Sequence, residues 1–66
     1  MQDTTPSIRL CTLAETAEQL RKTEPQLRWL IHTKQAPKSA LIGGRRMFRQ
    51  ADIDAWITAQ FEQASA

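Results

Sequence analysis

The sequence predicts a small, mainly α-helical fold of about three helices with one β-hairpin attached. Three segments carry helical patterns, in which apolar residues recur three or four positions apart, and two of these follow residues suited to a helix start. A further segment, residues 40–48, has apolar runs on either side of Gly43-Gly44, which is typical of a hairpin turn. A chain of 66 residues is long enough for one domain with a thin core.

The two ends of the chain have few residues that a fold can bury. Residues 1–7 are predicted to be a disordered lead-in, because the Thr, Pro and Ser residues there offer nothing apolar. Residues 62–66 are predicted to form a frayed tail. The folded domain is therefore expected to span residues 8–61, and its first residues, 8–11, are expected to form a very short strand or an extended arm.

The first helix is predicted over residues 13–20. Thr12 followed three residues later by Glu15 is a capping box, in which each side chain bonds the backbone N–H of the other residue. Three apolar residues then fall on one face of the helix: Leu13, Ala17 and Leu20.

A second start signal follows at Thr23, with Pro25 suited to the first turn and Gln26 completing another capping box. This helix is expected to end by about Lys34, because Pro37 disfavours helix at the residue before it. Two helices separated by so few residues form a helix-turn-helix arrangement, in which the second helix enters the major groove of DNA.

The register of the hairpin has two solutions. A two-residue loop of glycines puts Ile42 and Met47 on one face and Leu41 and Phe48 on the other. A three-residue loop instead lets Ile42 and Phe48 share the face toward the core. Some apolar side chains point outward in both cases.

The third helix is predicted from Gln50 to about Phe61, because apolar residues recur along it with helical spacing. Its stripe consists of Ile53, Trp56, Ile57 and Phe61. Asp52 and Asp54 lie near its start, where the helix dipole favours negative charge.

Positive charge is concentrated in one segment. From Arg21 to Arg49 the chain has eight Lys or Arg residues and one acidic residue, a formal charge of +7. The remainder has one arginine and six acidic residues, a charge of −5, which agrees with the net charge of +2. A basic block on one contiguous segment is typical of a surface that binds phosphates.

Other classes of function receive little support from the residues. One cysteine, Cys11, allows no internal disulfide and is interpreted as a small apolar filler in a strand. With one histidine, His32, the chain has too few ligands for a structural zinc site of Cys and His. We therefore expect no catalytic residues, no metal, no cofactor and no small-molecule substrate. No apolar run approaches the roughly 20 residues that span a bilayer, so a cytoplasmic protein without a membrane partner is expected.

We predict a DNA-contacting surface built from the second helix and the hairpin. Amide and guanidinium groups suit base edges and phosphates, and closely spaced arginines suit a narrow minor groove. The hairpin arginines have an alternative interpretation, as ordinary side chains on a solvated turn. Trp29 also has two interpretations, as a ring that contacts a thymine methyl group or as a side chain that closes the edge of the core. The predicted DNA-binding residues are Thr23, Gln26, Arg28, Trp29, His32, Lys38, Arg45, Arg46 and Arg49.

In this order the segments resemble the small winged helix-turn-helix proteins of the phage excisionase and AlpA-like group, whose fold is related to the DNA-binding domain of MerR regulators. The resemblance covers roughly residues 9–58, in the stretches RLCTLAETAEQL, TEPQLRWLI, APKSALIGGRRMFR and QADIDAWI. Arg21 occupies a position that is usually glycine in that group, and Trp29 occupies a position where arginine is expected.

The resemblance implies a sequence-specific DNA-bending factor that binds several adjacent sites and assists a tyrosine integrase in excising a phage genome from the DNA of a bacterial host. One unit of this size contacts few base pairs, so copies on adjacent sites would supply specificity. Leu41 or Met47, whichever faces outward, is the predicted contact between copies. The alternatives are a small AlpA-like prophage transcriptional regulator and, from a different class, a protein-interaction module that uses Trp29 and the apolar face of the wing.

Overall fold

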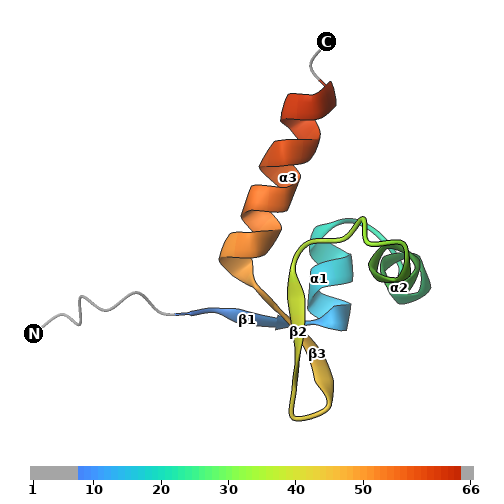
Figure 1. Ribbon diagram of the computed structural model, residues 1–66, viewed down its shortest axis with the longest axis vertical. Coiled ribbons are helices and arrows are strands. Elements are labelled where there is room, and N and C mark those ends of the chain that lie inside the picture. The colour runs from blue at the N-terminus through green and yellow to red at the C-terminus, as the bar shows by residue number, and fades with distance from the viewer. Residues whose placement is uncertain (1–7, 65–66) are drawn as a thin grey trace, which may run out of the picture.

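The computed structural model describes residues 8–64, so the expectations for residues 1–7 and for the last two residues lie outside it. Its elements are β1 (Leu10–Thr12), α1 (Leu13–Gln19), α2 (Glu24–His32), β2 (Ser39–Ile42), β3 (Arg45–Arg49) and α3 (Gln50–Ala64). The strands form one antiparallel sheet in the order β1-β3-β2 (Figure 1). The predicted winged helix-turn-helix fold is confirmed. Within residues 8–64 no helix is both long enough and apolar enough to cross a membrane.

Both helices of the helix-turn-helix begin with the capping boxes that the sequence predicted. The Glu15 N–H donates to Thr12 Oγ1 at 3.1 Å, and the Thr12 N–H donates to Glu15 Oε1 at 2.8 Å. Thr23 and Gln26 repeat the arrangement at 3.2 and 2.8 Å. Each box bonds backbone N–H groups that a helix start otherwise leaves to solvent, so both starts are fixed locally.

The same two helices end on a cationic residue in the left-handed conformation. Arg21 has a φ of 60°, and its N–H donates to the Glu18 carbonyl at 3.0 Å. The next N–H, that of Lys22, donates to the Ala17 carbonyl at 2.8 Å. Lys34 repeats this geometry after α2, with a φ of 61°. This pair of bonds is the Schellman motif, in which glycine is the usual left-handed residue. Arg21 therefore adopts a glycine-like conformation at the position where the resembling proteins usually carry glycine.

The core takes one buried apolar residue from each element except β2. These residues are Cys11, Ala17, Leu27, Phe48 and Ile53. Partly buried apolar side chains pack around them: Leu13, Leu20, Leu30, Ile31, Ala36 and Ile57. Cys11 is 3% exposed in β1, and its thiol also makes polar contacts: Sγ donates to Gln50 Oε1 at 3.3 Å and accepts from Gln19 Nε2 at 3.5 Å.

The wing has the register of a two-residue loop. Ile42 pairs with Arg45 across the two glycines, and Ala40 pairs with Met47. Gly43 and Gly44 have φ values of 59° and 82°, the positive values that a type I′ turn requires at both positions. Ile42 and Met47 therefore share one face of the sheet, which is the first of the two predicted arrangements.

α3 continues to Ala64, three residues beyond its expected end at Phe61. The added glutamate, glutamine and alanine have high helix propensity. The helical hydrogen bonds therefore continue beyond Ile57, the last residue of α3 that packs against the core. Figure 1 shows the distal half of α3 projecting away from the sheet. Near the body, Trp56 Nε1 donates to the Gln35 carbonyl at 3.0 Å and ties α3 to the loop after α2.

Replacing Arg21 with glycine is expected to stabilise the domain. A non-glycine residue in the left-handed region carries a penalty of about 1–2 kcal/mol, and glycine removes it at a smaller cost in unfolded-chain entropy. We expect the free energy of unfolding, measured by urea titration, to rise by about 1 kcal/mol.

Lys22→Gly is the matched control, because it removes the neighbouring cation at a residue without a positive φ. This control should lower the free energy of unfolding by about 0.5–1 kcal/mol. A loss of stability in Arg21→Gly as large as in the control would contradict the assigned strain at Arg21.

Candidate nucleic-acid interface

The outward face of α2 lies opposite the residue that anchors the helix in the core. Leu27 is fully buried, whereas Pro25 and Trp29, two positions before and after it, lie about 160–200° away around the helix and are exposed. The Trp29 side chain is 64% exposed, so it does not close the edge of the core. The ring is therefore available at the surface.

Trp29 has an aromatic neighbour and borders a shallow hollow. Its ring centroid lies 6.1 Å from that of His32, with 34° between the two planes. The ring also borders an open hollow of about 360 Å³, lined by Lys22, Pro25, Gln26, Trp29 and Leu30. The predicted residues Gln26 and Trp29 are thus brought together on one surface.

Two side-chain oxygens at the start of α2 already accept hydrogen bonds from the backbone of the helix itself. Thr23 Oγ1 and Gln26 Oε1 accept the two capping bonds. Gln26 Nε2 remains as a donor for a base or a phosphate, whereas two-pronged pairing of Gln26 with adenine requires its oxygen to accept from the base as well as from the cap.

Arg28 is held in an exposed ion pair on α2. Its Nη2 atom lies 3.3 Å from Glu24 Oε1, and the two side chains are 62% and 46% exposed. Exposed pairs at this spacing contribute only about 0.3–0.5 kcal/mol. A phosphate can therefore compete with Glu24 for the guanidinium.

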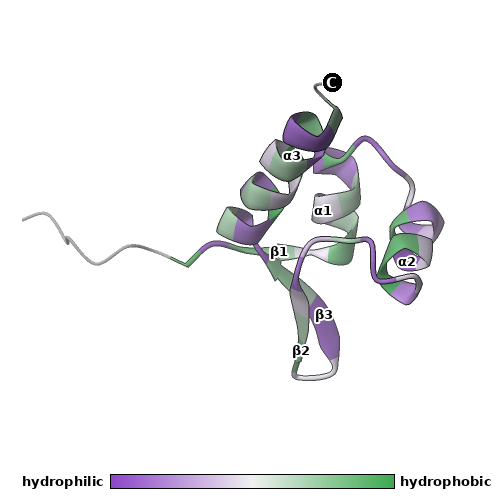
Figure 2. Ribbon diagram, turned by 45° about the horizontal axis from the view of Figure 1, so that its top comes forward, coloured by the Kyte–Doolittle hydropathy of each residue, from purple (hydrophilic) through white to green (hydrophobic). Residues whose placement is uncertain are grey.

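The two arginines after the turn of the wing point to opposite faces of the hairpin, because successive residues of a strand alternate. Arg46 lies on the face of Phe48, and its Nη1 donates to Ser39 Oγ at 3.0 Å. Arg45 lies on the other face and is exposed. Figure 2 shows β3 as hydrophilic toward the turn, where both residues lie.

Arg46 and the end of α2 meet at a second hollow. This hollow has a volume of about 260 Å³ and is lined by Ile31, Lys34, Ala36, Pro37, Ser39 and Arg46. The fold thus brings a wing residue beside the end of α2, although the two elements are separated by a loop in the sequence. Lys34 was not among the predicted site residues, and neither was Lys22, which lines the hollow beside Trp29. Both lysines could have been found from the sequence, because each lies within three residues after the end of a helix.

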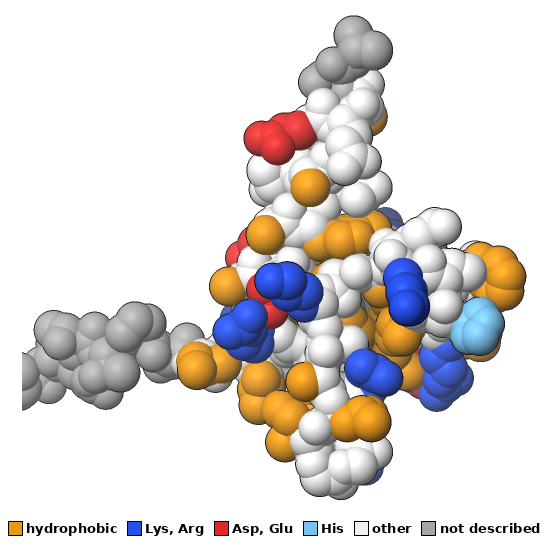
Figure 3. All heavy atoms as spheres, viewed as in Figure 1, with side chains coloured by type: hydrophobic (Ala, Val, Ile, Leu, Met, Phe, Trp, Pro, Cys, Tyr) orange, Lys and Arg blue, Asp and Glu red, His pale blue; other side chains and the backbone are white. Residues whose placement is uncertain are grey.

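The base of the wing carries two more of the predicted cations. Arg49 Nε donates to Asp52 Oδ2 at 2.7 Å, and the Asp52 side chain is only 19% exposed, so Arg49 is tied to the first turn of α3. Lys38 is exposed and has no ion-pair partner among residues 8–64. Figure 3 shows blue Lys and Arg side chains spread from the base of the wing to α2 on one side of the molecule.

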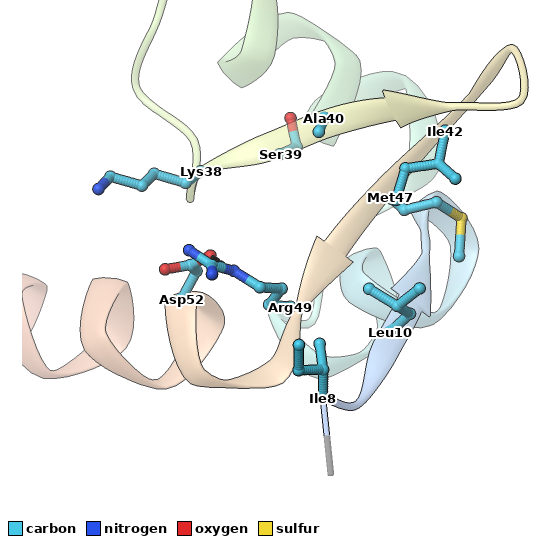
Figure 4. Close-up of a pocket in the computed structure, with 9 residues that line it drawn as sticks. All are labelled: Ile8, Leu10, Lys38, Ser39, Ala40, Ile42, Met47, Arg49 and Asp52. Carbon is cyan, nitrogen blue, oxygen red and sulfur yellow. Dashed lines mark hydrogen bonds and ion pairs between the residues drawn. The ribbon is translucent and has the colours of Figure 1, made fainter. Parts of the chain in front are cut away.

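The face of the sheet opposite the buried Phe48 carries an apolar groove that extends to the first turn of α3 (Figure 4). It has a volume of about 670 Å³ and is lined by Ile8, Leu10, Lys38, Ser39, Ala40, Ile42, Met47, Arg49 and Asp52. Met47 is half-buried in this groove, whereas Leu41 is 65% exposed on the opposite face. The two predicted contacts between copies therefore lie on different faces of the wing.

Comparison with known proteins matches most of the chain to one family model. Residues 10–60, well over half of the chain, match the helix-turn-helix domain family. The chain has no significant match among curated proteins or among solved structures.

The two glycines of the wing turn are expected to differ in their tolerance of side chains. A Cβ at either position would meet no atom within 4 Å, so the effect of a substitution comes from the backbone conformation. Gly43→Asn should leave the free energy of unfolding within about 0.5 kcal/mol of the wild type, since Asn is favoured at this position of the turn. Gly44→Ala should lower it by about 1–2 kcal/mol in thermal or urea unfolding. Equal effects at the two positions would contradict the assigned turn.

Proposed function

The chain belongs to the helix-turn-helix domain family, and from this membership we infer that it binds double-stranded DNA through α2 and the wing. The observation that carries this proposal is the surface on which the outward face of α2, the loop after it and the wing join, with exposed cations along it. Phosphate contacts supply most of the affinity in such interfaces, and base contacts supply the sequence preference.

The geometry supports different roles for α2 and the wing in binding DNA. α2 presents Trp29 at the centre of its outward face, where base edges would lie, with Arg28 beside it in reach of phosphates. The wing presents Arg45 and Arg46 on its two faces. Because the two sugar-phosphate backbones form the two walls of the minor groove, a wing inserted there would offer one arginine to each wall.

At a finer level, we propose an excisionase-type accessory factor that bends DNA at several adjacent sites and assists a tyrosine integrase in excising a phage genome. The small size of the unit and its resemblance to the excisionase group support this role. An AlpA-like transcriptional regulator would use the same DNA-binding surface. An excision assay with the integrase and its attachment sites separates the two roles, because a regulator would bind DNA without stimulating excision.

The DNA-binding proposal predicts how the affinity depends on salt. Each phosphate that a cation neutralises contributes about −0.9 to the slope of log affinity against log salt. In gel-shift titrations on neighbouring genomic DNA and on random DNA, replacing both Arg45 and Arg46 with alanine should make the slope less steep by about 1.8.

Arg9→Ala is the matched control, because Arg9 is an exposed arginine that lies outside the basic segment, in a hollow with Glu15 and Glu18. It should leave the slope within experimental error. Failure of the wild type to bind any DNA at low salt would overturn the proposal, and the basic surface would then require an acidic protein partner.

Contacts between copies on adjacent sites are proposed to involve the wing. Leu41→Gln and Met47→Gln each remove an apolar side chain without adding a charge that would repel DNA. We expect the variant at the contact to lower the cooperativity on two-site DNA by about tenfold, equivalent to about 1.4 kcal/mol, while single-site affinity changes less than twofold. Undiminished cooperativity in both variants would show that the copies meet elsewhere or act independently.

A further inference from the structure

The centre of the outward face of α2 is an indole ring. Trp29 is 64% exposed, Pro25 lines the same hollow about one helical turn earlier, and the ring centroid of His32 is 6.1 Å away. The hollow beside the ring is completed by Gln26, Leu30 and Lys22. The outward face of α2 therefore exposes a large apolar ring at its centre.

The chemistry of the indole limits what it can read. Its polar atom, Nε1, is a donor only, so the side chain cannot form the two-pronged donor and acceptor pairs by which Asn or Gln recognises adenine. The base edges in the major groove present donors and acceptors, together with one apolar feature, the C5-methyl group of thymine. Cytosine carries the same feature when it is methylated at C5. The methyl group is the part of a base edge that suits the ring and the hollow.

We propose that Trp29, together with the adjacent hollow at Pro25, reads the C5-methyl group of a pyrimidine in the major groove. The chain then selects thymine or 5-methylcytosine over unmethylated cytosine at one position of its site. This inference rests on the proposed DNA binding and adds to it the base feature that is recognised and the residue that recognises it.

Removing only the methyl group tests this proposal. DNA enriched by the wild-type protein from a random pool is synthesised with its thymines replaced one at a time by deoxyuridine, which keeps every donor and acceptor. We expect one of these replacements to weaken wild-type binding about fourfold, the factor expected when one buried methyl group is lost. At that position, cytosine should also bind more weakly than 5-methylcytosine by a similar factor.

The variant Trp29→Ala links the methyl effect to the ring. In this variant the ratio of the dissociation constants for the deoxyuridine and thymine duplexes should fall from about four to about one. Phe61→Ala is the matched control, since Phe61 is an exposed aromatic residue on the distal part of α3, 73% exposed, and lies outside the interface. It should keep the fourfold ratio. Unfolding curves of both variants check that the domain remains folded.

The outcomes separate this inference from the DNA-binding proposal. If the protein binds its enriched DNA but no deoxyuridine replacement changes the affinity, Trp29 does not recognise a pyrimidine methyl group. The inference is then overturned, and the DNA-binding proposal stands. A methyl effect that persists in Trp29→Ala also overturns the inference, because another residue then reads the group. If the wild type binds no DNA and enriches no sequence, the proposed DNA binding is wrong, and the proposed recognition of a methyl group by Trp29 is wrong with it.

Discussion

Burial of Phe48 is the interaction on which the geometry of the wing depends. The ring lies fully buried in the middle strand of the sheet, between its cross-strand neighbours Cys11 and Ser39. Because strand residues alternate between faces, fixing Phe48 toward the helices also fixes the direction of its neighbours along β3. Arg46 consequently lies on the side of α2, and Arg45 lies on the outer side. Burial of this one aromatic residue therefore decides which arginine lies on which face of the wing.

The helix-turn-helix is held by local interactions of a different kind. Capping boxes fix where α1 and α2 begin, and Schellman bonds fix where they end, so α2 follows α1 with little freedom in the turn. Arg21 and Lys34 occupy left-handed positions where glycine is less strained. Glycine at these positions would relieve the strain but would remove positive charge next to the proposed DNA surface, a trade between stability and function that binding sites commonly show.

The surface of the domain divides into regions of different chemistry. Cations lie along α2, the loop after it and the wing, whereas the rest of the chain carries most of the acidic residues. Such a dipolar molecule approaches DNA in a preferred orientation, because the potential near a polyanion attracts one side and repels the other. The apolar groove on the outer face of the sheet lies beside this cationic side, with Lys38 and Arg49 at its edge. A second copy on an adjacent site is the proposed occupant of the wing surface.

The sequence by itself determined the helix starts at Thr12 and Thr23 and the hairpin at Gly43-Gly44, because caps and tight turns are satisfied by residues within four positions of one another. It also determined the fold class, through the order of these signals. Tertiary structure decided the register of the wing, the exposure of Trp29 and the pairing of β1 with β3. Each of these depends on which side chains meet across the core, and several arrangements satisfy the local pattern equally well. Packing around Phe48, Leu27 and Ile53 selects one of them.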